Sequence, residues 1–235
     1  MIPKTAPAGQ AVFPALRDLP SPDDDATSTM RRLAAQPIGR RGFMAGIVRA
    51  TACVAAGGLA SILPIQESYA STPDPARPGT PLDALVPVIK PELALRNANT
   101  GETFKGSYFS WSRAGYDPQA IEKLCWFFRD WREKEVATID PRLFWGLSAL
   151  SQAARKEGNS GQIIVTSGFR TRRTNSKLEG AVPNSMHLYG RAVDLVIDGV
   201  PTADVAKYMR WLQVGGVGHY PGRFVHVDTG RVRNW

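Results

Sequence analysis

The sequence predicts an α+β domain in which helices pack on a mostly antiparallel sheet. Segments with apolar residues at helical spacing come first, and short apolar runs with strand alternation follow them. All three histidines of the chain lie among these later runs. Helices that precede the strands, instead of alternating with them, favour α+β over a parallel α/β arrangement.

Two helices are predicted from their N-terminal caps. Asp117-Pro118 and Asp140-Pro141 each place a side-chain acceptor before a proline, which is typical of the first helical position. Apolar residues recur at helical spacing over residues 121–131 and again over 143–154, and Gly158 ends the second helix. These apolar stripes indicate a hydrophobic core and imply no cofactor.

The remaining elements are mostly strands. A turn-rich segment between two alternating runs predicts a β-hairpin over residues 93–104. Farther along the chain the pattern predicts a buried strand at 163–166, a loop over 171–186, a strand at Ala192–Ile197, a short helix from about Pro201, and two closing strands near Val217–Tyr220 and Phe224–Asp228.

The first 70 residues predict an export signal instead of a folded domain. Residues 1–35 are rich in Pro, Ala, Asp and Ser without an apolar period, so we expect disorder there. Arg40-Arg41 precedes an apolar, small-residue stretch at 50–65 and an A-x-A-like site that ends at Ala70. This pattern resembles a twin-arginine signal peptide. An uncleaved membrane anchor is the alternative, but the stretch is short and rich in Ala and Gly.

Cleavage after Ala70 would leave a linker and one domain. Six prolines over residues 71–91 predict a linker without regular structure, and residues 92–235 form the expected domain. Cys125 would be its single cysteine, which excludes an intramolecular disulfide. The net charge of +8 for the whole chain suits an acidic polymer outside the cytoplasm as well as it suits nucleic acid. We expect the export machinery as a partner, no nucleic-acid partner, and no stable membrane span after cleavage.

Two short C-terminal segments contain the candidate metal ligands. If the strands that hold Asp194 and His226 are neighbours, the alternation of side chains places both residues on one face. His187, in the loop before Gly190, can then supply a third ligand. Two imidazoles and one carboxylate leave a position open, as in catalytic zinc sites. Taken singly, His226 could be a core histidine and Asp194 could pair with an arginine.

These segments resemble a known family of enzymes. The S-x-H-x-x-G-x-A-x-D segment at 185–194 and F-V-H-V-D at 224–228 are similar to those of the M15 zinc peptidases. Ser-Gly-Phe-Arg-Thr at 167–171, Thr174-Asn175 and the C-terminal residues 215–235 resemble the exported murein endopeptidases of that family. The resemblance covers about residues 90–235.

The resemblance implies Zn²⁺ held by His187, Asp194 and His226. It also implies that Arg170 lies near the scissile carbonyl or a substrate carboxylate, because a guanidinium can stabilise a developing oxyanion. A structural ion pair is the alternative role for Arg170. Ser185 is expected either to hydrogen-bond the site or to cap its own loop.

The general base departs from the family pattern. Better-known relatives carry a glutamate three residues before the last zinc ligand, where this chain has Arg223, which cannot accept a proton. His219 carries an imidazole, the side chain best suited to acid/base work, and lies on the neighbouring predicted strand, so it is the preferred acid/base. Asp228 is the second candidate, although it could instead orient the imidazole of His226.

The implied function is hydrolysis of peptide cross-links in peptidoglycan by a periplasmic zinc endopeptidase. The peptide stems of peptidoglycan are the expected substrate, and the resembling subgroup is associated with links at meso-diaminopimelate. A carboxypeptidase that removes D-Ala is one alternative. A non-catalytic, zinc-stabilised module that binds the cell wall is another, which the missing glutamate favours.

Overall fold

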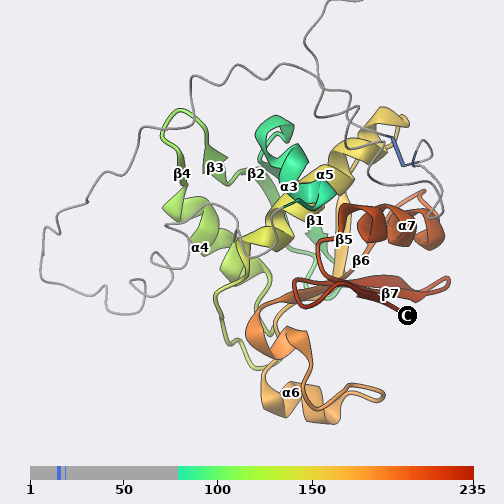
Figure 1. The fold of residues 1–235 in the computed structure, drawn as a ribbon. Helices are drawn as coiled ribbons and strands as arrows, with labels where there is room; N and C mark the ends of the chain where they lie inside the picture. The colour runs from blue at the N-terminus through green and yellow to red at the C-terminus, as the bar shows by residue number, and fades with distance from the viewer. Residues whose placement is uncertain (1–14, 17–18, 20–78) are drawn as a thin grey trace, which may run out of the picture.

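The computed structural model of the protein describes residues 15–16, 19 and 79–235 (Figure 1). Its elements, in chain order, are α3 Pro81–Leu85, η1 Val86–Val88, β1 Glu92–Asn97, β2 Thr103–Ser107, β3 Phe109–Ser110, β4 Gly115–Tyr116, α4 Pro118–Phe127, α5 Pro141–Lys156, β5 Ile163–Ser167, α6 Arg172–Lys177, η2 Met186–Tyr189, β6 Ala192–Ile197, α7 Thr202–Leu212, β7 Gly216–Tyr220, β8 Phe224–Asp228 and β9 Arg233–Asn234. Here η denotes a 3₁₀-helix.

A seven-stranded sheet with the order β2-β1-β5-β6-β8-β7-β9 organises the chain. Neighbouring strands are antiparallel except for the pairs β1–β5 and β7–β9. The predicted hairpin is β1–β2, and the predicted closing strands are β7 and β8. The α+β class with a mostly antiparallel sheet is therefore confirmed.

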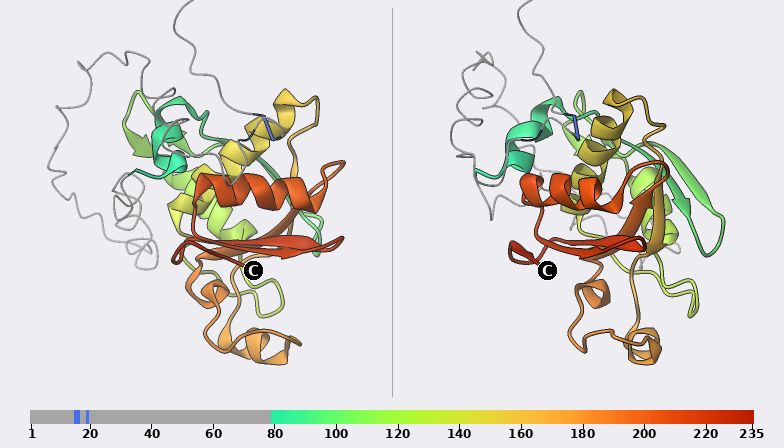
Figure 2. Two further views of the ribbon diagram at one scale, coloured as in Figure 1. Left: turned by 45° about the vertical axis from the view of Figure 1, so that its right-hand side comes forward. Right: turned by 90° about the vertical axis from the view of Figure 1, so that its right-hand side faces the viewer.

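The two faces of the sheet have different environments. Val193 and Leu195 of β6, with Val225 and Val227 of β8, point to one face and are fully buried. Helix α7 contacts β6, β7 and β8, and α5 contacts β1 and α7. Figures 1 and 2 show α7 on one side of β7, whereas α6 and the loops around it lie on the other side. The helical layer thus covers the apolar face and leaves the opposite face to the loops.

Both predicted helices begin at their predicted caps. The side chain of Asp117 accepts a hydrogen bond from the backbone N–H of Ala120 in α4, and Asp140 caps α5 in the same way. Helix α4 is shorter than its apolar pattern predicts: it ends at Phe127, so Trp131 lies outside it.

Two segments predicted to be irregular contain helices. Within the expected loop over 171–186, Thr171 accepts a hydrogen bond from the backbone N–H of Thr174 and starts α6. Within the expected linker over 71–91, Pro81 starts α3, since a proline suits the first helical position. Thr80 and Asp83 close a capping box there, in which each side chain bonds to the backbone N–H of the other.

The N-terminal region lies largely outside the described residues, including the predicted twin-arginine signal and its cleavage site. Leu16 and Leu19 are described, and both are buried in the hydrophobic core. The rest of residues 1–35, apart from residue 15, lies outside the described residues, so disorder there stays a prediction. Among the described residues, none of the helices has the length and apolar character needed to cross a membrane.

A buried arginine joins α3 to the helical layer. The Arg142 guanidinium donates to Asp83 Oδ1 at 2.7 Å, to Thr80 Oγ1 at 2.9 Å and to the Val214 carbonyl at 3.1 Å. Removing this side chain would leave buried acceptors without donors. The loss of folding free energy from each unsatisfied acceptor is larger than the net stabilisation from one hydrogen bond.

We expect Arg142→Met to lower the free energy of unfolding by about 3 kcal/mol, because it breaks a buried, hydrogen-bonded ion pair. Denaturant unfolding followed by circular dichroism measures the change. The control is Arg96→Met, at an exposed position of β1. Equal stability of the two variants would show that Arg142 does not hold α3 in place.

Candidate metal centre and its surroundings

The register of two central strands brings Asp194 and His226 together. Strand β6 pairs with β8 so that Asp194 lies directly opposite His226, and Ala192 lies opposite Asp228. Directly opposed residues of an antiparallel pair share a face. Because Val193 and Leu195 occupy the helix-covered face, Asp194 and His226 point to the other face, as the alternation predicted.

His187 reaches the same point from a loop. It lies in η2, where Ser185 Oγ accepts a hydrogen bond from the backbone N–H of His187 at 3.4 Å. Gly190 ends η2 with φ of 63°, and a Cβ at this position would lie 2.1 Å from the Thr138 carbonyl oxygen. A glycine is therefore required for the sharp turn that leads from His187 into β6.

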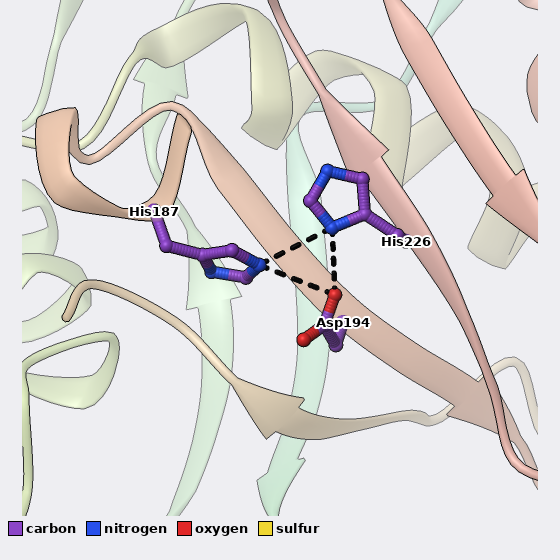
Figure 3. A group of neighbouring side chains, drawn as sticks. All are labelled: His187, Asp194 and His226. Atoms are coloured by element: carbon purple, nitrogen blue, oxygen red, sulfur yellow. Dashed lines mark hydrogen bonds and ion pairs between the residues drawn. The ribbon is translucent and has the colours of Figure 1, made fainter. Parts of the chain in front are cut away.

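The three side chains point toward one another (Figure 3). Asp194 Oδ1 lies 2.8 Å from His226 Nδ1 and 3.2 Å from His187 Nε2, and the two ring nitrogens are 3.2 Å apart. One nitrogen or oxygen donor from each residue thus lies within 4.8 Å of the others. This convergence is what the sequence predicted, and it makes a group that can hold a metal ion.

Hydrogen bonds behind the group set the tautomers of both imidazoles. His187 Nδ1 lies 2.6 Å from the Gly168 carbonyl oxygen, which can only accept, so Nδ1 carries the proton and the Nε2 lone pair is free for a metal. His226 Nε2 lies 3.2 Å from Asp228 Oδ2. When that nitrogen donates to the carboxylate, the Nδ1 lone pair faces Asp194.

Asp228 is placed to orient His226, not to act on a substrate. Its side chain is fully buried, and it accepts hydrogen bonds from Arg233 at 2.7 and 3.1 Å and from the backbone N–H of Gly230 at 2.7 Å. Burial alone would raise the pKa of Asp228, but the bonds from His226 and Arg233 lower it to about 2. Of its two predicted roles, this geometry supports orientation of the imidazole.

The two histidines favour the charged form of the Asp194 carboxylate that lies between them. Burial would raise the pKa of Asp194, yet His187 and His226 hold it well below its usual range. Burial lowers the pKa of His187, against the influence of Asp194, so this imidazole is neutral near pH 7. For His226, the hydrogen bonds with Asp194 and Asp228 outweigh burial and raise the pKa.

His219 does not join the group. It pairs with Val225, whereas Gly218 pairs with His226, so the His219 side chain points to the helix-covered face. There its Nε2 lies 3.0 Å from Thr202 Oγ1, at the start of α7. The predicted acid/base role of His219 does not fit this geometry, because the sheet separates its imidazole from the three ligands.

Arg170 lies beside the group of three side chains, and Ser185 contacts Arg170. Arg170 Nη2 donates to Ser185 Oγ at 3.3 Å, so this serine both caps η2 and contacts the site. Burial lowers the pKa of Arg170, and Asp194 is the main opposing charge. Arg170 Nε is buried without a hydrogen-bond partner among the described residues. No carboxylate forms an ion pair with Arg170 in the described chain, in contrast to the structural alternative.

Two supporting residues were not predicted from the sequence. Asp130 accepts hydrogen bonds from the Thr171 backbone N–H at 2.9 Å and from its hydroxyl at 3.0 Å, which fixes the loop after Arg170. Arg233 neutralises Asp228. Asp130 follows an apolar helix and belongs to no motif. Its hydrogen-bond partner, Thr171, is 41 residues away, so no local sequence pattern predicts their contact.

We expect Asp228→Asn to lower the affinity for zinc by about 10- to 100-fold, since the amide no longer offers a charged acceptor to His226. Isothermal titration of the metal-free protein with zinc measures this change. Asp198→Asn, at an exposed turn after β6, is the matched control. Unchanged affinity in Asp228→Asn would show that the carboxylate does not tune the ligand.

Comparison with known proteins assigns the chain to a family. The family model described as peptidoglycan L,D-endopeptidase MepK matches residues 88–235. The chain is 36% identical over 162 residues to the peptidoglycan L,D-endopeptidase MepK of Escherichia coli (strain K12), which covers 66% of this chain and 86% of that protein. It is 38% identical over 158 residues to the probable peptidoglycan L,D-endopeptidase MepK of Haemophilus influenzae, which covers 65% of this chain and 83% of the relative. The chain therefore belongs to the MepK family of M15 peptidases, as its motifs predicted.

Proposed function

We propose that this protein is a zinc-dependent murein endopeptidase that hydrolyses peptide cross-links of peptidoglycan in the bacterial envelope. The observation that carries the proposal is the convergence of His187, Asp194 and His226, with their tautomers set from behind, in a chain of the MepK family. The L,D-endopeptidase names of the relatives favour an internal cross-link over a terminal D-Ala as the bond that is cut.

The donor set fits zinc. Tetrahedral coordination at the usual Zn–N and Zn–O lengths places ligand atoms about 3.3 Å apart. The donor atoms of the group are separated by 2.8, 3.2 and 3.2 Å, so small side-chain shifts accommodate the ion. Two imidazole nitrogens, with His226 giving up a proton when the metal binds, and one carboxylate oxygen are donors that zinc accepts, and three protein ligands leave one position open.

Each residue of the site then has a defined task. A bound zinc ion supplies a polarised water near neutral pH and a Lewis acid for the scissile carbonyl. His187, Asp194 and His226 would hold that ion, while the Gly168 carbonyl and Asp228 would keep the two imidazoles in the ligating tautomers.

Arg170 is the substrate-binding and transition-state residue of the proposal. Its half-buried guanidinium donates to Ser185, and its buried Nε has no acceptor among the described residues. A carbonyl oxygen that gains negative charge, or a carboxylate of the peptide stem, supplies the missing acceptor. Preorganised donors of this kind stabilise the oxyanion without reorganisation during the reaction.

We also propose that the protein acts in the periplasm after export by the twin-arginine route. The pattern around Arg40-Arg41 supports this route, and so does a cell-wall substrate. Replacing both arginines with lysine should leave uncleaved protein in the cytoplasm, whereas the wild type yields a mature chain that begins at Ser71, as read by mass spectrometry of cell fractions. The same exchange at Arg31-Arg32 is the control, and retention of both variants to an equal extent would contradict the assignment of the motif.

The function is tested by digestion of purified, cross-linked peptidoglycan, with products read by mass spectrometry. We expect cross-linked dimers to become monomers, and chelation of the metal or Asp194→Asn to slow this conversion by at least about 10³-fold, because several kcal/mol of charge stabilisation are lost. Asp198→Asn, exposed and outside the site, should match the wild type.

Three other outcomes would contradict the proposal in different ways. Conversion that survives chelation would refute the zinc dependence. Released D-Ala with intact dimers would identify a carboxypeptidase. An absence of products from folded, zinc-loaded protein would identify a module that binds the cell wall without cutting it.

A further inference from the structure

The C-terminal residues pair with β7 at the edge of the sheet, and the Trp235 side chain lies over Gly218 on the face of the metal ligands. Strand β9 pairs with β7 so that Arg233 lies opposite Gly216, and Trp235 bonds to β7 through its backbone N–H to Val217 and its carbonyl to the N–H of His219. A Cβ at Gly218 would lie 2.6 Å from the Trp235 indole. The absence of a side chain at Gly218 therefore creates the space that the indole occupies.

The Trp235 indole connects the metal group to a tyrosine. Its ring centroid lies 5.4 Å from that of His226, and its Nε1 donates to the Tyr220 hydroxyl at 3.2 Å. The Arg233 guanidinium, itself bound to Asp228, lies 4.9 Å from the centroid of the indole. The indole is half exposed, and it contacts His226, Arg233 and the Tyr220 hydroxyl.

Tyr220 belongs to the same face as the ligands. It pairs with Phe224, two residues along the register from the pair Gly218–His226, so Tyr220, Phe224 and His226 all point to one side. The Tyr220 ring stacks on Phe224 with centroids 4.4 Å apart. Tyr220 raises the pKa of Arg170, an effect smaller than those of burial, Asp194, Arg132 and Asp130, so the two side chains lie within electrostatic range of each other.

The Tyr220 hydroxyl has a proton to donate. An indole N–H can only donate, so the Tyr220 oxygen is the acceptor in its bond with Trp235, and its own hydrogen stays available. No acceptor within the described chain takes that hydrogen. Arg170 Nε is likewise a donor without a partner among the described residues. Arg170 Nε is buried, whereas the Tyr220 hydroxyl lies in an exposed hydrogen bond, so a bound substrate can reach both and supply an acceptor to each.

We propose that Tyr220 is a further catalytic residue, whose hydroxyl donates a hydrogen bond to the oxygen of the scissile carbonyl, and that Trp235 is its positioning residue. This inference rests on the proposed endopeptidase function. The hydroxyl keeps its proton throughout, so no bond of Tyr220 is made or broken. Its contribution is electrostatic and largest when the carbonyl oxygen carries negative charge.

The test begins with Tyr220→Phe, assayed on cross-linked dimers of peptidoglycan stems. Loss of one oxyanion donor should lower kcat by about 10²-fold or more, with KM and zinc content unchanged. A phosphinate analogue of the cut amide, titrated calorimetrically, gives a readout other than turnover: its Kd should rise at least about tenfold, whereas the Kd of the monomer product should not change.

Trp235→Phe removes the indole N–H and keeps a large ring. If Trp235 acts through Tyr220, the Trp235→Phe substitution lowers kcat in the wild-type background but not in the Tyr220→Phe background. A double-mutant cycle measures this difference. Tyr116→Phe is the matched control, since the Tyr116 hydroxyl also accepts from an indole, that of Trp145, at 3.0 Å but away from the metal group. Its kcat should equal that of the wild type.

Each failure has a separate meaning. A wild-type protein that converts no dimers refutes the endopeptidase function itself. An active wild type, together with Tyr220→Phe of unchanged kcat and unchanged phosphinate affinity, overturns the catalytic role of Tyr220. Equal losses from Trp235→Phe in both backgrounds overturn its positioning role and assign it to stability alone.

Discussion

The pairing of β6 with β8 determines the site, because it sets Asp194 directly opposite His226. Side chains alternate along a strand, so a slip of one residue would turn His226 toward the helices and place a valine beside Asp194. The buried valines on the helix-covered face oppose that slip, since it would expose them. The hydrophobic core therefore protects the register on which the metal ligands depend.

A second constraint extends from the ligands to the end of the chain. Asp228 lies two residues after His226 on the same face, where a buried carboxylate needs donors. Arg233 and the backbone N–H of Gly230 supply them, which holds the C-terminal segment against β7 and brings Trp235 beside His226. The Asp228 carboxylate thus both orients the His226 imidazole and helps to position Trp235.

The loop face is assembled from parts that are far apart in sequence. Gly168 and Arg170 follow an irregularity at the end of β5, between Val165 and Ser167, which re-aims the chain toward the ligands. Asp130 holds this loop through Thr171. Because Thr171 follows Arg170 directly, a change at Asp130 would act on the candidate site through the position of Arg170.

The sequence by itself determined the α+β class, the helix caps at Asp117 and Asp140, and the shared face of Asp194 and His226, because caps and strand alternation are local patterns. It did not determine on which face His219 points, since that depends on how β7 registers with β8. Nor did it reveal the roles of Asp130, Tyr220 and Trp235. Those follow from contacts between distant segments, and such contacts exist only after the sheet has formed and its two faces have been divided between helices and loops.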